Sequence, residues 1–121
     1  MHTIKTNTNL VAPITYLKAT QSELEDIVNG CGPAGWKEKL VPDTIWGLNI
    51  NSACAIHDYC YHIGVTDKDK KEADELFLGN MNQLVKNANS WWLINKLRYH
   101  RAKVYYSAVD KFGGSAFKNK G

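Results

Sequence analysis

The chain has 121 residues, of which 44% are hydrophobic and 22% are charged, a composition that fits one ordinary globular domain and excludes a disordered or collagen-like chain. Fifteen Lys and Arg residues against twelve Asp and Glu residues give a net charge of +3, too mild a basic balance to indicate a dedicated nucleic-acid binder. No run of about 18 apolar residues is present and the first residues lack the apolar core of a signal peptide, so we expect neither a transmembrane segment nor a secretion signal.

The cysteine content limits what covalent cross-links can contribute to stability. The chain has three cysteines, Cys31, Cys54 and Cys60, so at most one intrachain disulfide can form and at least one thiol remains. This excludes a disulfide-scaffold fold, and helical packing must carry most of the stability.

The N-terminal part of the chain shows no regular hydrophobic pattern. Residues 1–19 are rich in Thr and Asn, contain Pro13, and have no sustained period of 3.6 or 2. We expect them to form an extended N-terminal arm laid over a single helical domain of residues 20–121. No strand pattern in the chain is better than Leu40-Val41.

The domain is expected to open with a short helix and a long loop. Two overlapping capping boxes begin at Thr20 and Ser22, and Gly30 is expected to end the helix that they start. Residues 30–50 then hold most of the turn-forming residues of the chain. A loop of this length inside a domain is usually functional or disordered, and its aromatic and aliphatic side chains argue against disorder.

Three helical patterns follow the loop. Asn51 is expected to be the N-cap of the first helix and Gly64 its end. The second pattern starts at about Thr66 and the third at Ser90. Because only a few residues connect the first two helices, we expect them to run antiparallel. The sequence therefore predicts an all-α fold, with two long antiparallel helices and a third C-terminal helix.

The third helix carries an apolar stripe that is expected to face the core. Leu93, Leu97, Val104 and Ala108 recur at helical spacing along it. The stripe predicts which side of this helix packs against the rest of the domain.

The four tryptophans have two possible environments. Trp91 and Trp92 are adjacent and diverge by about 100° on a helix, so we expect one in the core and the other partly exposed. Trp36 and Trp46 lie in the long loop. They are either core residues or aromatic side chains that dip into a lipid interface.

The most informative segment is Cys54-Ala55-Ile56-His57-Asp58-Tyr59-Cys60-Tyr61, which follows a Gly-rich loop at residues 30–35. Adjacent helical residues point about 100° apart, so His57 and Asp58 must face different partners. Asp58 can offer a carboxylate to a hard cation, together with the carbonyl groups of the Gly-rich loop. His57 is then available as a general base.

A general base works better when another group orients its far ring nitrogen, and Asp74 is the candidate. Asp74 lies three residues before Phe77, on the extension of the apolar stripe of the second long helix. A carboxylate aimed at the core requires a partner. We expect His57 to be that partner, with the Tyr61 hydroxyl donating to the same carboxylate.

In this order, a Cys-Gly-Pro-x-Gly loop, a Cys-x-x-His-Asp-x-Cys-Tyr helix and an Asp on the next long helix resemble the secreted-type phospholipase A2 superfamily. The resemblance covers roughly residues 30–112. Within the superfamily, the chain is most similar to the small phage and bacterial members. It implies calcium-dependent hydrolysis of the sn-2 ester of glycerophospholipids at a membrane surface, which would be a transient partner.

The resemblance also implies roles for matching residues. His57 would take a proton from water, Asp74 would orient His57, and Tyr61 would support Asp74. The Gly32 N–H would help to stabilise the oxyanion. The implied calcium ligands are the Asp58 carboxylate and the carbonyl groups of Gly30, Gly32 and either Ala34 or Gly35.

The chain also departs from the family pattern. Its Cys-Gly-Pro-Ala-Gly loop is one residue longer than the Cys-Gly-x-Gly loop of the best-known members. Of the family disulfides, only a bridge between Cys31 and Cys54 has both partners here, and Cys60 is implied to be a thiol in the core.

Three alternatives remain beside the enzyme. A catalytically weak lipid-binding or phage structural module would keep the fold without turnover. A basic helical nucleic-acid binder is disfavoured because the basic residues are dispersed. A zinc site made by Cys54, His57 and Cys60 is disfavoured by geometry, since Cys60 lies about 240° around the helix from Cys54.

Overall fold

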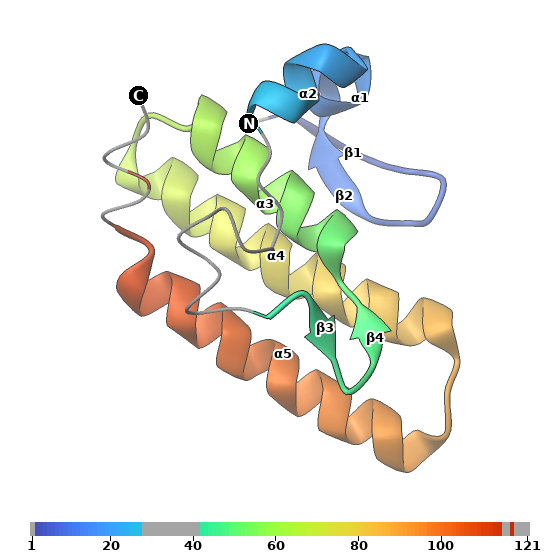
Figure 1. The fold of residues 1–121 in the computed structure, drawn as a ribbon. Helices are drawn as coiled ribbons and strands as arrows, with labels where there is room; N and C mark the ends of the chain where they lie inside the picture. Colours follow the sequence, from blue (N-terminus) through green and yellow to red (C-terminus); the bar gives the residue numbers. More distant parts are fainter. Residues whose placement is uncertain (1, 28–41, 115–116, 118–121) are drawn as a thin grey trace.

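Three long helices dominate the computed structural model, which describes residues 2–27, 42–114 and 117. They are α3 (Asn51–Ile63), α4 (Asp67–Ala88) and α5 (Trp92–Phe112). α4 lies between the other two, and both run antiparallel to it (Figure 1). The expectation of a mainly helical fold is confirmed, although the described residues also include two small antiparallel sheets.

The ends of these helices follow local sequence signals. Gly64 is the C-cap of α3, as expected, but Ile50 rather than Asn51 is its N-cap. Thr66 caps α4 by accepting a hydrogen bond from the Asp69 backbone N–H, and the Asp69 carboxylate accepts one from the Thr66 backbone N–H in return. This reciprocal pair satisfies two backbone donors at the start of the longest helix.

The segment expected to be an extended arm is folded. β1 (Thr3–Lys5) and β2 (Val11–Pro13) form an antiparallel hairpin, and α1 (Ile14–Lys18) and α2 (Gln21–Ile27) follow it. The Thr6 hydroxyl accepts a hydrogen bond from the Leu10 backbone N–H at 3.2 Å and so closes the turn between the strands. Strands of three residues are too short for an alternating pattern to stand out, which is why periodicity did not predict them.

At the start of α2, Thr20 makes the N-cap hydrogen bond that the first of the two expected capping boxes requires. The Thr20 hydroxyl accepts a hydrogen bond from the Glu23 backbone N–H at 3.2 Å. Ser22 lies inside α2, so it does not cap the helix. Gly30, the expected end of the helix, lies outside the described residues.

Asn80 attaches the N-terminal hairpin to α4. Its side-chain oxygen accepts a hydrogen bond from the Val11 backbone N–H at 2.7 Å, and its side-chain nitrogen donates to the Val11 carbonyl at 2.9 Å. The Asn80 side chain is buried. Its two hydrogen bonds to Val11 are of the kind that the backbone of a neighbouring strand would make to β2. This contact brings Leu10 and Ala12 into the core beside α3.

Replacement of Asn80 by leucine is expected to lower the free energy of unfolding by about 1–3 kcal/mol, because the Val11 N–H and carbonyl would lose their partner in a partly buried place. Urea unfolding measures this change. Gln83→Leu, on the same helix, removes a side-chain amide that donates to the exposed Asn87 side chain; it is the matched control and should stay within about 0.5 kcal/mol. Equal effects of the two substitutions would contradict the anchoring role.

A second hairpin packs against α5. β3 (Thr44–Ile45) and β4 (Leu48–Asn49) are joined by Trp46 and Gly47, whose φ angles are 47° and 81°. Two consecutive positive φ angles are typical of the type I′ turn that joins two-residue hairpins. The Tyr105 hydroxyl donates to the Thr44 carbonyl at 3.0 Å and fixes this hairpin on α5. Leu40-Val41, the expected strand pattern, lies outside the described residues.

The rotation of α5 differs from the expected one. Ala102, Tyr105 and Val109 face the core, whereas Leu93, Leu97 and Val104 are 37% to 43% exposed. The expected core stripe is therefore wrong for these three residues, whereas its fourth member, Ala108, is partly buried. Apolar residues occupy two sides of this helix, so periodicity alone does not decide which side is buried. The small Ala102 and the hydrogen bond of Tyr105 favour burial of the side that carries them.

Both tryptophans at the start of α5 are on the surface. Trp91 and Trp92 are each 66% exposed, and their rings pack edge to face with centroids 6.0 Å apart. The expectation that one of them is a core residue is wrong. Within the described residues, no helix combines the length and the hydrophobicity needed to cross a bilayer.

Candidate active site

The centre of the site is the Asp74 carboxylate, which is buried between α3 and α4. Its Oδ1 atom lies 2.7 Å from His57 Nε2 and accepts a hydrogen bond from the Tyr61 hydroxyl, also at 2.7 Å. Its Oδ2 atom accepts a hydrogen bond from Lys70 Nζ at 2.7 Å. Asp74 is 0% exposed and His57 is 1% exposed. The structure thus brings together the three residues expected here and adds a fourth.

Helix geometry explains why these groups meet. His57 and Tyr61 are one turn apart on α3, so they share a face. Asp74 precedes Phe77 on the buried side of α4, and α3 packs antiparallel against that side (Figure 1). The sequence argument from the register of Asp74 therefore led to the correct neighbour.

Lys70 was not among the site residues that the sequence analysis predicted. Besides Asp74, its ammonium group donates to the Asp110 carbonyl at 3.3 Å and the Val109 carbonyl at 3.4 Å. One lysine therefore connects the carboxylate of α4 to the last turn of α5. The i,i+4 spacing of Lys70 and Asp74 was the signal that could have identified it.

The Asp74 carboxyl group is ionised. Burial opposes its ionisation, but the hydrogen bonds from His57, Lys70 and Tyr61 outweigh burial and lower the pKa of Asp74 below its ordinary value. An ionised carboxylate only accepts hydrogen bonds. His57 Nε2 must therefore carry a proton, and in the neutral ring Nδ1 carries the lone pair.

Contacts with Tyr61 and Phe77 help to hold the His57 ring in place. Burial, followed by the negative charge of Asp74, raises the pKa of Tyr61 above its usual range, so its hydroxyl stays a donor. The His57 ring stacks on Phe77 with centroids 4.7 Å apart and lies 4.2 Å from the Tyr61 ring centroid. An imidazole held in one orientation and one tautomer, with a lone pair on Nδ1, is suited to act as a general base.

The lowered pKa of Asp74 predicts an acid-sensitive fold. A depressed pKa in the folded state gives stabilisation that is present above the pKa of the unfolded chain, about 4, and is lost as the pH falls through the folded-state value. The stability difference between wild type and Asp74→Asn is therefore expected to shrink below about pH 4. Urea unfolding between pH 3 and 7 measures it. Glu75→Gln, an exposed acid on α4, should show no such trend.

Asp58 is the described part of the expected calcium site. It follows His57 on α3 and is buried, and a buried carboxylate needs a cation or hydrogen-bond donors. This property fits a hard cation that prefers oxygen ligands. The other expected ligands and the oxyanion donor lie outside the described residues; they are Gly30, Gly32, Ala34 and Gly35.

The cysteines and the zinc alternative can be placed in part. Cys54 is fully buried on α3, and Cys60 is a buried thiol of the core. Cys31 lies outside the described residues, so the bridge between Cys31 and Cys54 stays a prediction. In the part of the chain that the structure describes, no group of three or more His, Cys, Asp or Glu side chains is placed to hold a metal ion.

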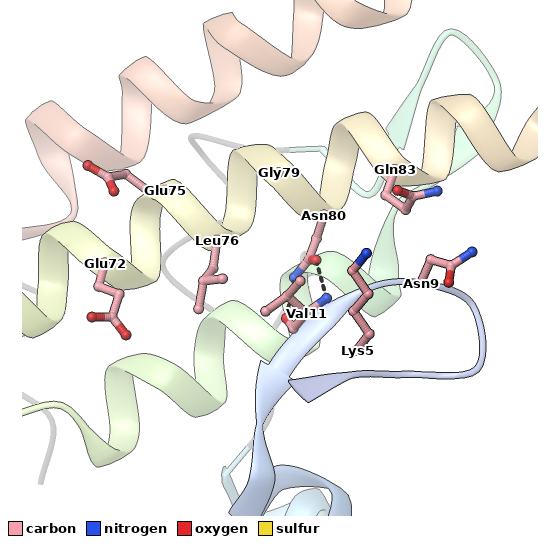
Figure 2. A pocket seen from close by; sticks show the side chains of 9 residues that line it. All are labelled: Lys5, Asn9, Val11, Glu72, Glu75, Leu76, Gly79, Asn80 and Gln83. Carbon is pink, nitrogen blue, oxygen red and sulfur yellow. Dashed lines mark hydrogen bonds between the residues drawn. The ribbon is translucent and has the colours of Figure 1, made fainter. Parts of the chain in front are cut away.

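A surface pocket lies apart from the Asp74 cluster, between the N-terminal hairpin and α4 (Figure 2). It has a volume of about 280 Å³ and is lined by Lys5 and Val11 of the hairpin and by Glu72, Leu76 and other α4 residues. Asn80 reaches across to Val11 inside it, as Figure 2 shows. None of the residues predicted for the active site lines this pocket.

Comparisons with models of protein families, with curated proteins and with solved structures find no match for this chain.

Proposed function

We propose that the chain is a calcium-dependent esterase of the phospholipase A2 type, which hydrolyses the sn-2 ester of glycerophospholipids. The observation that carries the proposal is the 2.7 Å contact between His57 Nε2 and Asp74 Oδ1, with Asp58 next to His57 on the same helix. This arrangement supports a base on one side of α3 and a cation ligand on another.

In the proposed reaction His57 Nδ1 takes a proton from a water molecule, and the water oxygen attacks the ester carbonyl carbon. Asp74 stabilises the imidazolium ring through Nε2. The ring then returns the proton to the departing glycerol oxygen, which leaves a fatty acid and a lysophospholipid. A positioned general base contributes a rate factor of roughly 10²–10⁴.

The residues that would hold calcium are Asp58 and the carbonyl groups of Gly30, Gly32 and Ala34 or Gly35. Bound there, the ion supplies a Lewis acid for the developing oxyanion. The Gly32 N–H would be a second oxyanion donor, and one such donor is worth roughly 10²–10³ in rate.

Release of fatty acid from mixed anionic vesicles in millimolar calcium tests the proposal. Wild type is expected to release fatty acid in calcium and to stop when calcium is chelated. His57→Ala is the control for contaminating lipase activity. If wild type releases no more than this control, the chain is not a phospholipase, and the catalytically weak lipid-binding module becomes the better description.

Asp58 is expected to couple calcium binding to stability. A ligand that binds only the folded chain stabilises it by RT ln(1 + [L]/Kd), or about 2.7 kcal/mol at a hundredfold excess over Kd. Magnesium should stabilise the chain poorly, because it requires small octahedral geometry and loses water reluctantly. The melting temperature over a calcium titration measures this effect.

Two variants make that titration specific. Asp58→Asn should lose the calcium-dependent rise in melting temperature, whereas Asp43→Asn, an exposed acid before β3, should keep it. An equal rise in Asp58→Asn and wild type would show that Asp58 is not a ligand.

A further inference from the structure

Several large apolar side chains are exposed at the start of α5 and in the β3–β4 turn. Trp91 and Trp92 are 66% exposed, Trp46 is 50% exposed, and Leu93 and Leu97 continue the apolar surface along the helix. We call these five residues, with Lys96, Arg101 and Lys103, the α5 face. Exposed apolar groups gathered in one place are typical of a binding surface, whereas single ones need no explanation.

Positive charge predominates along α5. Residues 90–109 contain four basic residues, Lys96, Arg98, Arg101 and Lys103, and no acidic residue. Since the whole chain has a net charge of +3, the rest of the chain has a net charge of 3 − 4 = −1. The positive charge is therefore concentrated on this helix, although the chain as a whole is only mildly basic.

Helical geometry interleaves the charged and apolar groups. At 100° per residue, Leu93 and Leu97 lie on the side of α5 away from its core face, with Lys96 to one side of them and Arg101 to the other. A helix with apolar side chains bordered by basic ones is suited to lie in the plane of an anionic interface.

Arg98 holds the turn and the helix start together. Its Nη2 donates to the Trp46 carbonyl at 3.0 Å and its Nη1 to the Ser90 hydroxyl at 2.9 Å. The β3–β4 turn is thereby held beside Ser90, at the start of α5 (Figure 1). A hollow of about 380 Å³ lined by Trp46, Gly47 and Arg101 lies between the turn and α5.

The backbone of Trp46 adds to this pattern. Its φ of 47° is in the left-handed region, which is uncommon for residues other than glycine, asparagine and aspartate. The type I′ turn requires this backbone conformation, and it places the half-exposed Trp46 side chain at the tip of the β3–β4 hairpin.

We propose that the α5 face docks the protein on the surface of an anionic phospholipid bilayer. Tryptophan rings prefer the boundary between headgroups and acyl chains, and basic side chains are attracted to anionic headgroups. A nucleic acid would match the charge but offers no apolar layer for the exposed tryptophan and leucine side chains. The inference deepens the proposed function, on which it rests, by naming the surface that holds the enzyme on its substrate.

Vesicle sedimentation with the His57→Gln variant tests docking without turnover. We expect it to bind vesicles that contain phosphatidylglycerol, and to bind vesicles of phosphatidylcholine alone much more weakly. Trp91→Ser/Trp92→Ser should weaken binding at least about tenfold. Lys96→Gln/Lys103→Gln should weaken it roughly 30-fold, at about 1 kcal/mol per lysine, and should reduce its dependence on salt.

Matched variants change the same kinds of side chain elsewhere. Val65→Ser/Phe112→Ser removes two side chains that are 81% and 64% exposed, near the opposite end of the helices. Lys68→Gln/Lys71→Gln removes two exposed charges from the start of α4. Both should bind vesicles like the parent. Equal losses in the control and α5 variants, or tighter binding to duplex DNA than to anionic vesicles, would overturn the inference.

A water-soluble short-chain phospholipid separates this inference from the proposed function. If the α5 face is not the docking surface, wild type still hydrolyses the soluble substrate, while the Trp91→Ser/Trp92→Ser and Lys96→Gln/Lys103→Gln variants bind vesicles as strongly as the parent. If the proposed function is wrong, wild type fails to hydrolyse the soluble substrate, whatever the binding experiment shows.

Discussion

Replacement of Asp74 by alanine is expected to lower the free energy of unfolding by about 3–5 kcal/mol, the usual cost of removing one partner of a buried ion pair. The Lys70 ammonium, the Tyr61 hydroxyl and the His57 Nε2 proton would all lose their shared acceptor. Urea unfolding at pH 7 measures this loss.

Two further variants test the reason for that loss. Glu75→Ala removes an exposed carboxylate one residue along α4 and should change the free energy of unfolding by no more than about 0.5 kcal/mol. Lys70→Met in the Asp74→Ala background removes the unpaired charge and should recover part of the stability. If Asp74→Ala costs no more than Glu75→Ala, the cluster around Asp74 does not stabilise the fold.

Replacement of His57 by glutamine is expected to reduce kcat/KM for vesicle hydrolysis by a factor of about 10²–10⁴. Glutamine is of similar size, and its side-chain amide can still donate to Asp74, but it has no lone pair basic enough to take a proton from water. The melting temperature should therefore change little while the rate falls. Initial rates of fatty acid release, measured beside thermal unfolding, separate the two effects.

His62→Gln provides the control for that substitution. His62 is on the same helix but exposed, and its replacement should leave the rate within about twofold of wild type. A His57→Gln variant that stays fully folded and keeps the wild-type rate would remove His57 from the proposed mechanism.

The long helices and the contact between His57 and Asp74 were accessible from sequence, because both depend on local and strongly periodic signals. Thr66 and Gly64 mark helix ends through capping chemistry that acts within one turn. The position of Asp74 relative to Phe77 indicates a buried carboxylate, and the short connection between α3 and α4 leaves α3 as the neighbouring helix.

The missed features depend on contacts between distant parts of the chain. α5 has apolar residues on two sides, and the Tyr105 bond to the β3 carbonyl of Thr44 helps to decide which side is buried. The N-terminal hairpin is held by Asn80, a polar residue whose role is visible only once the chain is folded. Lys70 resembled a solvated lysine because its bonds to Val109 and Asp110 join residues about 40 positions apart.

The most direct test of the proposed activity is the identity of its product. Vesicles would contain an anionic phospholipid with different acyl chains at its two ester positions, and mass spectrometry would identify the fatty acid and lysophospholipid released in calcium. Wild type is predicted to release the sn-2 fatty acid and leave the 1-acyl lysophospholipid, whereas His57→Gln should release almost none. Equal release from both proteins, or release of the sn-1 chain by wild type, would contradict a His57-dependent phospholipase A2 reaction.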